Sequence, residues 1–279
     1  MAATLKGQLF LSGKTACPRF SVNKMRLNMR NAEVVCISCG SPLLHHCAEA
    51  VSSADVTLFF AHQEAKMGAN MIVDPQPQIG LTGAVYVGGM SASINPFVTE
   101  RAIRRVVNCS DLHLMKRPDF VTWAQKVEQL QQDAVLVDVL RLGWRDDLDQ
   151  KLWVETEFDQ LMEAVRFVHA SRCAGDNCLV HCAQGKSRSG TVAIAYLMAT
   201  DPSCATYQAA LAKASRRRNI IEPNPCFAEQ LEAFSRSSQL AILQEELKEM
   251  TRATSEGTAP ISPLPCQQPS DEPPCEEQK

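Results

Sequence analysis

A cysteine and an arginine separated by five residues are the pair in this sequence best suited to chemistry. Cys182 and Arg188 lie in the segment Val-His-Cys-Ala-Gln-Gly-Lys-Ser-Arg-Ser-Gly, residues 180–190. A cysteine thiolate is a strong nucleophile. A guanidinium can hold two oxygens of a phosphate group in a planar fork. The residue types and their spacing therefore indicate a nucleophile beside an anion-binding group.

The elements around this segment support that interpretation. It joins a short apolar strand, residues 177–180, to an almost wholly apolar helix, residues 189–200, which ends at Asp201-Pro202. A loop that enters a helix N-terminus gathers backbone N–H groups and positive potential. Such surroundings lower a cysteine pKa from ~8.5 to roughly 3.5–7.5.

The loop therefore predicts specific roles for its residues. Cys182 is the expected nucleophile, and Ser189 is placed to donate a hydrogen bond to its sulfur. Arg188 and the loop between them are expected to bind a phosphate, with Gly185 allowing a close backbone approach. The expected substrate-binding residues are Ala183, Gln184, Gly185, Lys186 and Ser187. The alternative is a buried structural cysteine with solvated Arg188 and Lys186, which the full string disfavours.

The order of elements predicts the fold class. Strands are expected at 84–87, 105–108, 134–142 and 177–180, and helices at 99–105, 155–172, 189–200, 206–218 and 226–250. Strands that alternate with helices indicate an α/β fold with a central, mostly parallel sheet flanked by helices.

Three segments are expected along the chain. Residues 1–78 form an N-terminal extension of unknown role, with a helix at 41–54, a strand at 55–60 and a linker at 74–78. Residues 79–250 form the α/β domain. Residues 251–279 are rich in Pro, Ser and Glu and are expected to be a disordered tail.

Composition narrows the classes of protein. The chain has 28 Lys+Arg and 31 Asp+Glu, a formal net charge of −3, which is too near neutral for nucleic-acid or membrane binding by bulk charge. No signal-peptide pattern is expected at the N-terminus, and no apolar run reaches the ~18 residues of a spanning helix. With twelve cysteines, we expect reduced thiols in the cytoplasm, the nucleus or both.

The segment resembles the catalytic loop of cysteine-dependent protein tyrosine phosphatases, specifically the dual-specificity branch, His-Cys-x-x-Gly-x-Ser-Arg-Ser. The resemblance covers residues 79 to about 236. It includes Ile79-Gly-Leu, Val85-Tyr-Val-Gly-Gly, and Asn219-Ile-Ile-Glu-Pro-Asn followed by Phe227. Glu222 departs from the family, in which an Arg is common at this position.

The resemblance implies a hydrolase that cleaves phosphomonoesters in two steps through a phospho-cysteine. It implies a dual-specificity-like fold, phosphoprotein substrates, and no metal or organic cofactor. The family also supplies an Asp as general acid from a loop about thirty residues before the Cys. Alignment favours Asp146, and Asp147 and Asp149 stay open as alternatives.

Two other functions remain open. Lys186 is compatible with a phosphoinositide or other non-protein phosphatase, because lipid-directed relatives carry extra basic residues in this loop. Ala183, which follows Cys182, is not basic and counts against it. The second alternative is a catalytically weak phosphate-binding scaffold.

Several further residues have two interpretations each. His181 either tunes the thiolate or is simply packed, and Arg216-Arg-Arg218 either steers anions or ends a helix in solvent. Cys109 or Cys178 can protect an oxidised Cys182 as a disulfide, although plain core cysteines are the simpler interpretation. A zinc half-site and a protein partner for the Pro-rich tail complete the hypotheses. The zinc candidates are Cys36, Cys39, His45, His46 and Cys47.

Overall fold

The computed structural model describes residues 25–28, 33–36, 68–94, 96–111 and 118–256. In the first two ranges, β1 (Met25–Asn28) pairs antiparallel with β2 (Glu33–Cys36). The helix expected at 41–54, the strand expected at 55–60, the side chains of the zinc candidates and the tail beyond residue 256 lie outside the described residues.

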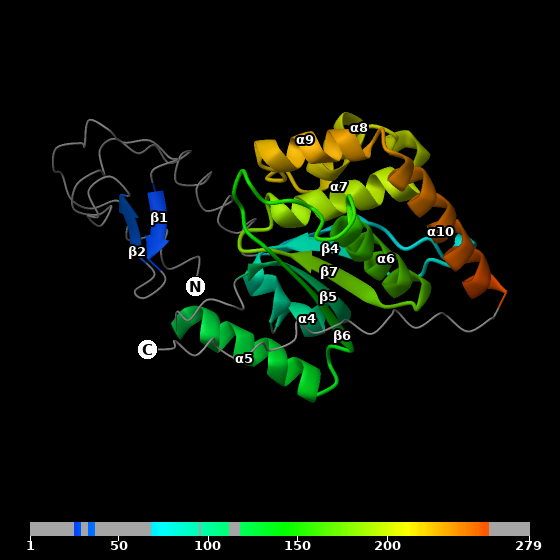
Figure 1. Cartoon of the computed structure of the whole chain (residues 1–279). Helices are drawn as coiled ribbons and strands as arrows, with labels where there is room; N and C mark the ends of the chain where they lie inside the picture. Colours follow the sequence, from blue (N-terminus) through cyan, green and yellow to red (C-terminus); the bar gives the residue numbers. More distant parts are fainter. Residues whose placement is uncertain (1–24, 29–32, 37–67, 95, 112–117, 257–279) are drawn as a thin grey trace, which may run out of the picture. The chain divides into compact units, whose positions relative to one another are not determined.

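A five-stranded sheet forms the centre of the domain (Figure 1). Its spatial order is β3 (Ala69–Val73), β4 (Val85–Gly88), β7 (Asn177–His181), β5 (Ile103–Ser110) and β6 (Asp138–Trp144). The last four run parallel, whereas β3 pairs antiparallel with β4 at one edge. The expected α/β fold with a mostly parallel sheet is confirmed.

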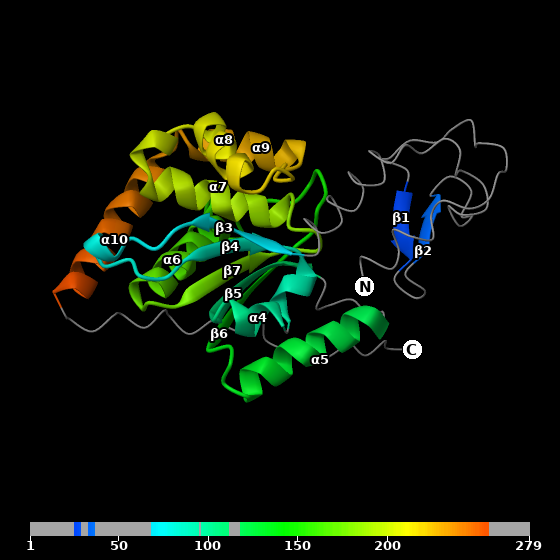
Figure 2. The same ribbon diagram turned by 180° about the vertical axis from the view of Figure 1, so that it is seen from behind.

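Helices cover both faces of this sheet, unequally (Figures 1 and 2). One face carries α6 (Asp159–Cys173), α7 (Arg188–Thr200), α8 (Tyr207–Arg217), α9 (Pro225–Phe234) and α10 (Ser238–Ser255). The other face carries α4 (Phe97–Glu100) and α5 (Pro118–Gln132). Short 3-10 turns lie at η3 (Pro77–Ile79), η4 (Met90–Ser93) and η6 (Pro202–Cys204).

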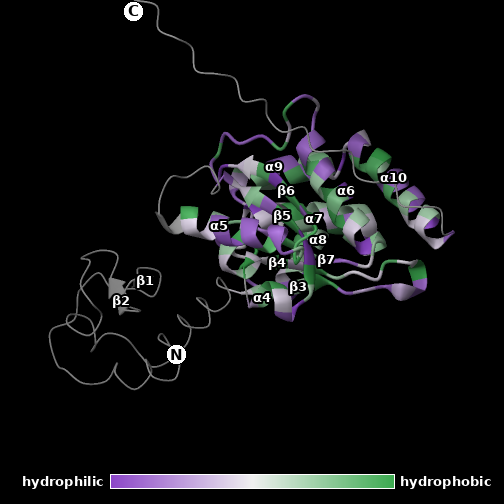
Figure 3. Ribbon diagram, turned by 90° about the horizontal axis from the view of Figure 1, so that it is seen from below, coloured by the Kyte–Doolittle hydropathy of each residue, from purple (hydrophilic) through white to green (hydrophobic). Residues whose placement is uncertain are grey.

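Helix α7 is the central helix of the larger layer. All of its residues from Arg188 to Ala199 are buried, and it packs against β4, β5 and β7. Helix α10 is amphipathic instead, with alternating green and purple bands in Figure 3 and with Leu240, Leu243 and Leu247 buried. A wholly apolar sequence thus predicts a helix surrounded by protein, as observed.

The prediction of a helix at 99–105 was wrong for residues 101–105. Helix α4 ends at Glu100, Ala102 has φ +47°, and β5 begins at Ile103. Strand β5 lies between β7 and β6, so Val106 and Val107 are buried on opposite faces. Central strands buried on both faces read as apolar runs, and periodicity alone does not separate such runs from helices.

Other boundaries also moved. Strand β3 lies within the segment expected to be an extension, so the sheet begins before residue 79. The helix expected at 226–250 is divided into α9 and α10. The Ser237 side chain caps α10 by accepting from the Leu240 N–H. Helix α10 then continues to Ser255, five residues into the expected tail.

Helix α5 was not expected from the sequence, although its core contacts have helical spacing. Trp123, Val127 and Leu130 are buried together against the face of the sheet opposite α7. The Trp123 Nε1–H donates to the Met90 carbonyl at 3.1 Å and to Ser93 Oγ at 2.9 Å. Its ring also packs edge to face against the His181 ring, with the two ring centroids 5.7 Å apart. Within the described residues, no helix has both the length and the hydropathy to cross a membrane.

Trp123→Ala is expected to lower the free energy of unfolding by roughly 3–5 kcal/mol, because it leaves a cavity beneath His181. Val121→Ala is the control, because Val121 is 42 % exposed on the same helix, and a change within about 0.5 kcal/mol is expected there. Urea denaturation followed by far-ultraviolet circular dichroism measures both. Equal losses would contradict the packing role of Trp123.

Candidate active site

The expected loop lies at the carboxyl end of β7 and leads directly into α7. Strands β4 and β5 flank β7 in parallel register, so the three strands end at the same edge. Ligand sites of parallel sheets lie at this edge. Cys182 is the first residue after β7 and is 1 % exposed.

The sulfur of Cys182 is surrounded by hydrogen-bond donors. The Gly185 N–H donates to Sγ at 3.2 Å, and Ser189 Oγ lies 3.3 Å from it. Burial raises the pKa of Cys182, but Arg188, the Ser189 hydroxyl and the N–H groups of Ser189 and Lys186 together bring it below the ordinary thiol value. The predicted neighbourhood of a thiolate is therefore present.

The carbonyl groups of the loop are held from outside. The Ala183 carbonyl accepts from the Met90 N–H at 3.3 Å, and the Lys186 carbonyl accepts from the Glu222 N–H at 3.2 Å. The Ser187 carbonyl accepts from the N–H of Thr191 at 2.9 Å. The carbonyls of Gln184 and Gly185 accept from Arg218. All five expected phosphate-binding residues thus belong to one loop with its carbonyls turned away from Cys182.

Gly185 is required here for a reason that the sequence did not indicate. Its φ is +71°, and a Cβ would lie 2.4 Å from the Gly88 carbonyl carbon and 2.6 Å from an Arg218 nitrogen. The close approach that we expected toward a phosphate is an approach toward β4 and Arg218.

Arg188 is buried at the N-terminus of α7. One of its terminal nitrogens donates to the Trp144 carbonyl at 3.0 Å and lies 3.5 Å from an Asp111 carboxylate oxygen. Its Nε is 3.6 Å from Asp146 Oδ2, but within the described residues this buried N–H has no hydrogen-bond acceptor. A buried donor without an acceptor is uncommon and is consistent with an anion-binding role.

The three candidate aspartates differ in their contacts. Asp146 Oδ1 accepts from Ser187 Oγ at 2.7 Å and from Asn224 Nδ2 at 3.0 Å. Asp147 instead pairs with Arg145 at 3.2 Å and accepts from the Asp149 N–H. Among the three, these contacts bring the carboxyl group of Asp146 to the loop.

His181 is packed below the loop. Burial lowers its pKa to about 4, so the ring is neutral near pH 7. Its Nδ1 lies 3.4 Å from the Cys182 carbonyl, and because a carbonyl only accepts, we assign the ring proton to Nδ1.

Sequence reasoning missed the positions of Asp111, Asn224 and Arg218. Asp111 follows β5, and the carboxyl ends of β5 and β7 lie side by side. The order of the strands could therefore have predicted that Asp111 lies near the loop. Asn224 caps α9 by accepting from the Phe227 N–H, and also reaches Asp146. Arg218 is buried beneath the loop, and the expectation that it is solvated or steers anions was wrong.

The two candidate disulfide partners are not equivalent. Asn108 pairs with His181 in the β5–β7 register, which places Cys109 beside Cys182. Cys178 lies four residues before Cys182, about 13 Å along the chain, beyond the Cα separation of a disulfide. Burial raises the pKa of both Cys109 and Cys178. Only the Cys109 disulfide stays a prediction.

No cluster of three or more metal-ligating side chains occurs within the described part of the chain. Six cysteines of the α/β domain are free: Cys109, Cys173, Cys178, Cys182, Cys204 and Cys226.

Comparisons with known proteins agree with this geometry. Residues 85–237 match the family model of the dual specificity phosphatase, catalytic domain, over more than half of the chain. The chain therefore belongs to the dual specificity phosphatase family, as its loop predicted.

Individual relatives match shorter segments. Dual specificity protein phosphatase 15 of Rattus norvegicus is 38 % identical over 105 residues, which are 37 % of this chain and 44 % of the relative. Dual specificity protein phosphatase 22-B of Danio rerio is 39 % identical over 87 residues, 31 % of this chain and 46 % of the relative. The matched segment spans less than half of each relative. The crystal structure of DUSP15 aligns with a TM-score of 0.49 and 26 % identity, covering 65 % of this chain and 96 % of that chain.

The thiol of Cys182 is expected to ionise at lower pH than an ordinary cysteine, because Arg188 and the loop N–H groups stabilise its thiolate. Ultraviolet thiolate absorbance, titrated in the wild type and in Cys182→Ser, gives its midpoint as the difference. Cys173→Ser is the matched control, since burial raises the pKa of Cys173. A Cys182 midpoint at or above ~8.5 would contradict the stabilising environment.

Proposed function

We propose that this protein hydrolyses phosphomonoesters in proteins, at phosphotyrosine and at phosphoserine or phosphothreonine, through a phospho-cysteine intermediate. The observation that carries the proposal is the loop from Cys182 to Arg188. It combines a low-pKa thiol, inward N–H groups and a buried guanidinium N–H without an acceptor. Family membership supports the same reaction.

In the first step the Cys182 thiolate attacks phosphorus, and the bond from phosphorus to the substrate oxygen breaks. Asp146 gives its carboxyl proton to that leaving oxygen. The loop N–H groups and Arg188 hold the phosphoryl oxygens as charge develops on them.

In the second step water attacks phosphorus and the phosphorus–sulfur bond breaks. Asp146, now a carboxylate, takes the proton of the attacking water. Ser189, 3.3 Å from the sulfur, stabilises the departing thiolate with its hydroxyl. The products are inorganic phosphate and the regenerated Cys182 thiolate, with no metal or organic cofactor.

A contact at the rim of the loop favours protein substrates over phosphoinositides. Lys186, which motivated the lipid alternative, lies 2.6 Å from a Glu222 carboxylate oxygen. An exposed pair of this kind contributes little stability, but it places a carboxylate beside the only lysine of the loop. A second phosphate group is repelled by Glu222. Glu222 is also the position at which the sequence departs from the family.

The cytoplasm or the nucleus is the proposed location. A thiolate nucleophile needs a reducing compartment, and the free cysteines of the described region are compatible with one.

Cys182→Ser is expected to lower kcat for an aryl phosphate by about 10⁴-fold or more, because the nucleophile is lost. Arg188→Ala is expected to lower kcat/KM by on the order of 10³-fold. Cys173→Ser is the control. Wild-type turnover by either site variant would refute the assignment.

The same assay separates the alternatives when it is run with phosphotyrosine and phosphothreonine peptides and with a soluble inositol phosphate. Turnover of the inositol phosphate alone would favour the lipid-directed function. Binding of phosphopeptides without turnover by the wild type would favour the scaffold.

Asp146→Asn is expected to lower kcat by roughly 10²–10⁴-fold. It should also abolish the limb of the pH profile on which activity falls as the pH rises, since a general acid works in its protonated form. Asp147→Asn is the matched control and should retain both activity and the limb. The reverse result would assign the proton donor to Asp147.

A further inference from the structure

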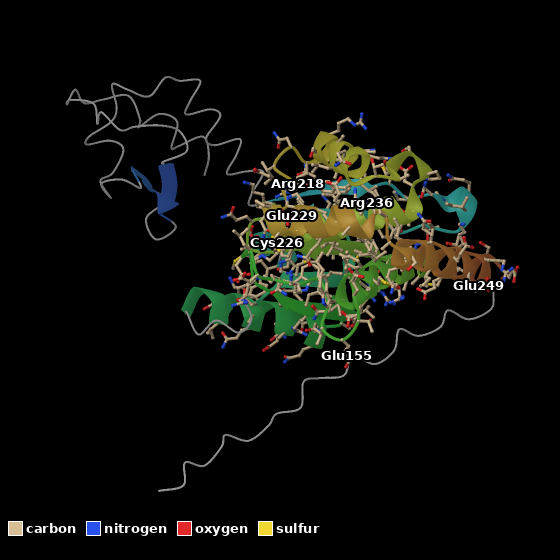
Figure 4. The ribbon with its side chains drawn as sticks, turned by 45° about the horizontal axis from the view of Figure 1, so that its top comes forward. Glu155, Arg218, Cys226, Glu229, Arg236 and Glu249 are labelled. Atoms are coloured by element: carbon tan, nitrogen blue, oxygen red, sulfur yellow. The ribbon has the colours of Figure 1, made fainter. Side chains whose placement is uncertain are left out.

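We propose that Arg218 is a positioning residue for this reaction: its guanidinium holds two carbonyls of the catalytic loop outward, so that the adjoining N–H groups face Cys182. The inference rests on the proposed function for its kinetic readout. Arg218 follows the last residue of α8 and is 1 % exposed. In Figure 4 it lies near the same end of the domain as Cys226, at the start of α9.

Two of the three described side-chain hydrogen bonds of Arg218 are made to the loop. Its Nε donates to the Gly185 carbonyl at 2.8 Å, and one terminal nitrogen donates to the Gln184 carbonyl at 3.2 Å. The other terminal nitrogen donates to Asn70 Oδ1 on β3 at 2.8 Å. The rigid fork of a guanidinium suits such fixed, divergent acceptors.

Because the peptide unit is rigid, these contacts also determine where the N–H groups of Gly185 and Lys186 point. A peptide unit is planar, with its carbonyl and the following N–H pointing in opposite directions. Holding the Gln184 carbonyl outward therefore turns the Gly185 N–H inward, and that N–H does donate to Cys182 Sγ at 3.2 Å. Holding the Gly185 carbonyl outward likewise turns in the Lys186 N–H, which helps to lower the pKa of Cys182.

Among the carbonyls from Ala183 to Ser187, those of Gln184 and Gly185 are the two whose described hydrogen bonds come from a side chain alone. The carbonyls of Ala183, Lys186 and Ser187 accept from backbone N–H groups. Backbone contacts are insensitive to side-chain identity, so substitution of Arg218 acts selectively on the Gln184 and Gly185 carbonyls.

The charge of Arg218 is buried among neutral hydrogen-bond acceptors. Within the part of the chain that the structure describes, its side chain donates to three neutral acceptors, and burial lowers its pKa to about 10. Burying a cation without a carboxylate partner is unfavourable. The negative group that favours its charge is Cys182, which is consistent with selection for the site.

The test compares Arg218→Gln and Arg218→Lys with two matched controls in the full chain. Arg216→Gln removes the same charge from an exposed position two residues away. Asn70→Ala removes the β3 contact while leaving the loop contacts. The readouts are kcat and KM for para-nitrophenyl phosphate, the thiolate titration of Cys182 and the thermal unfolding midpoint.

Arg218→Gln is expected to lower kcat by on the order of 10²-fold and to raise the Cys182 midpoint by about one pH unit. Arg218→Lys should show a smaller loss, since one ammonium does not span both carbonyls in a fixed fork. Arg216→Gln should stay within about twofold of wild type. Asn70→Ala should lower the thermal unfolding midpoint and leave the pH midpoint of the Cys182 thiolate close to that of the wild type.

Wild-type kcat and an unshifted midpoint in folded Arg218→Gln would overturn the inference. If that variant does not fold, Arg218→Lys decides in the same way. Equal effects of Asn70→Ala and Arg218→Lys on both readouts would also overturn it, because they would indicate a general brace. A wild type without hydrolysis would refute the proposed function, while the titration would still test Arg218.

Discussion

The site depends on one constraint, the outward orientation of the carbonyl groups between Cys182 and Arg188. Because each peptide unit is rigid, the direction of a carbonyl determines the direction of the next N–H. The groups that hold four of these carbonyls come from distant parts of the chain: the turn after β4, the end of α8 and the segment before α9. The fifth, that of Ser187, is held by the first turn of α7. The anion-binding loop is therefore a product of tertiary structure, although its sequence is local.

The same constraint explains why one buried cysteine differs from its neighbours. Cys109 and Cys178 are buried in the sheet, and Cys182 is buried directly after β7. Burial alone raises a thiol pKa. For Cys109 and Cys178 that effect dominates. For Cys182, Arg188 and the inward N–H groups reverse it. The reactive thiol is thus selected by the donors around it rather than by its exposure.

The sequence predicted the features that depend on local patterns, and it missed features that depend on tertiary contacts. Local patterns gave the loop, the buried helix α7 and the parallel strands, because periodicity and the strand–loop–helix order are local properties. Arg218 was missed because a run of three arginines at a helix end is typical of a solvated terminus. Its burial follows from contacts with residues more than thirty positions away. Helix α5 was missed although Trp123, Val127 and Leu130 have helical spacing.

Arg188 lies between two carboxylates, and one of them, Asp146, is the proposed proton donor. A buried guanidinium needs partners, and Arg188 has Trp144, Asp111 and Asp146 around it. Asp146 comes from the loop after β6, and its side chain is 37 % exposed, more than the 24 % of Asp111. The Arg188 Nε, the proposed hydrogen-bond donor to the phosphate, lies 3.6 Å from the Asp146 carboxyl group. One buried arginine thus connects the proposed phosphate-binding loop with the proposed proton donor.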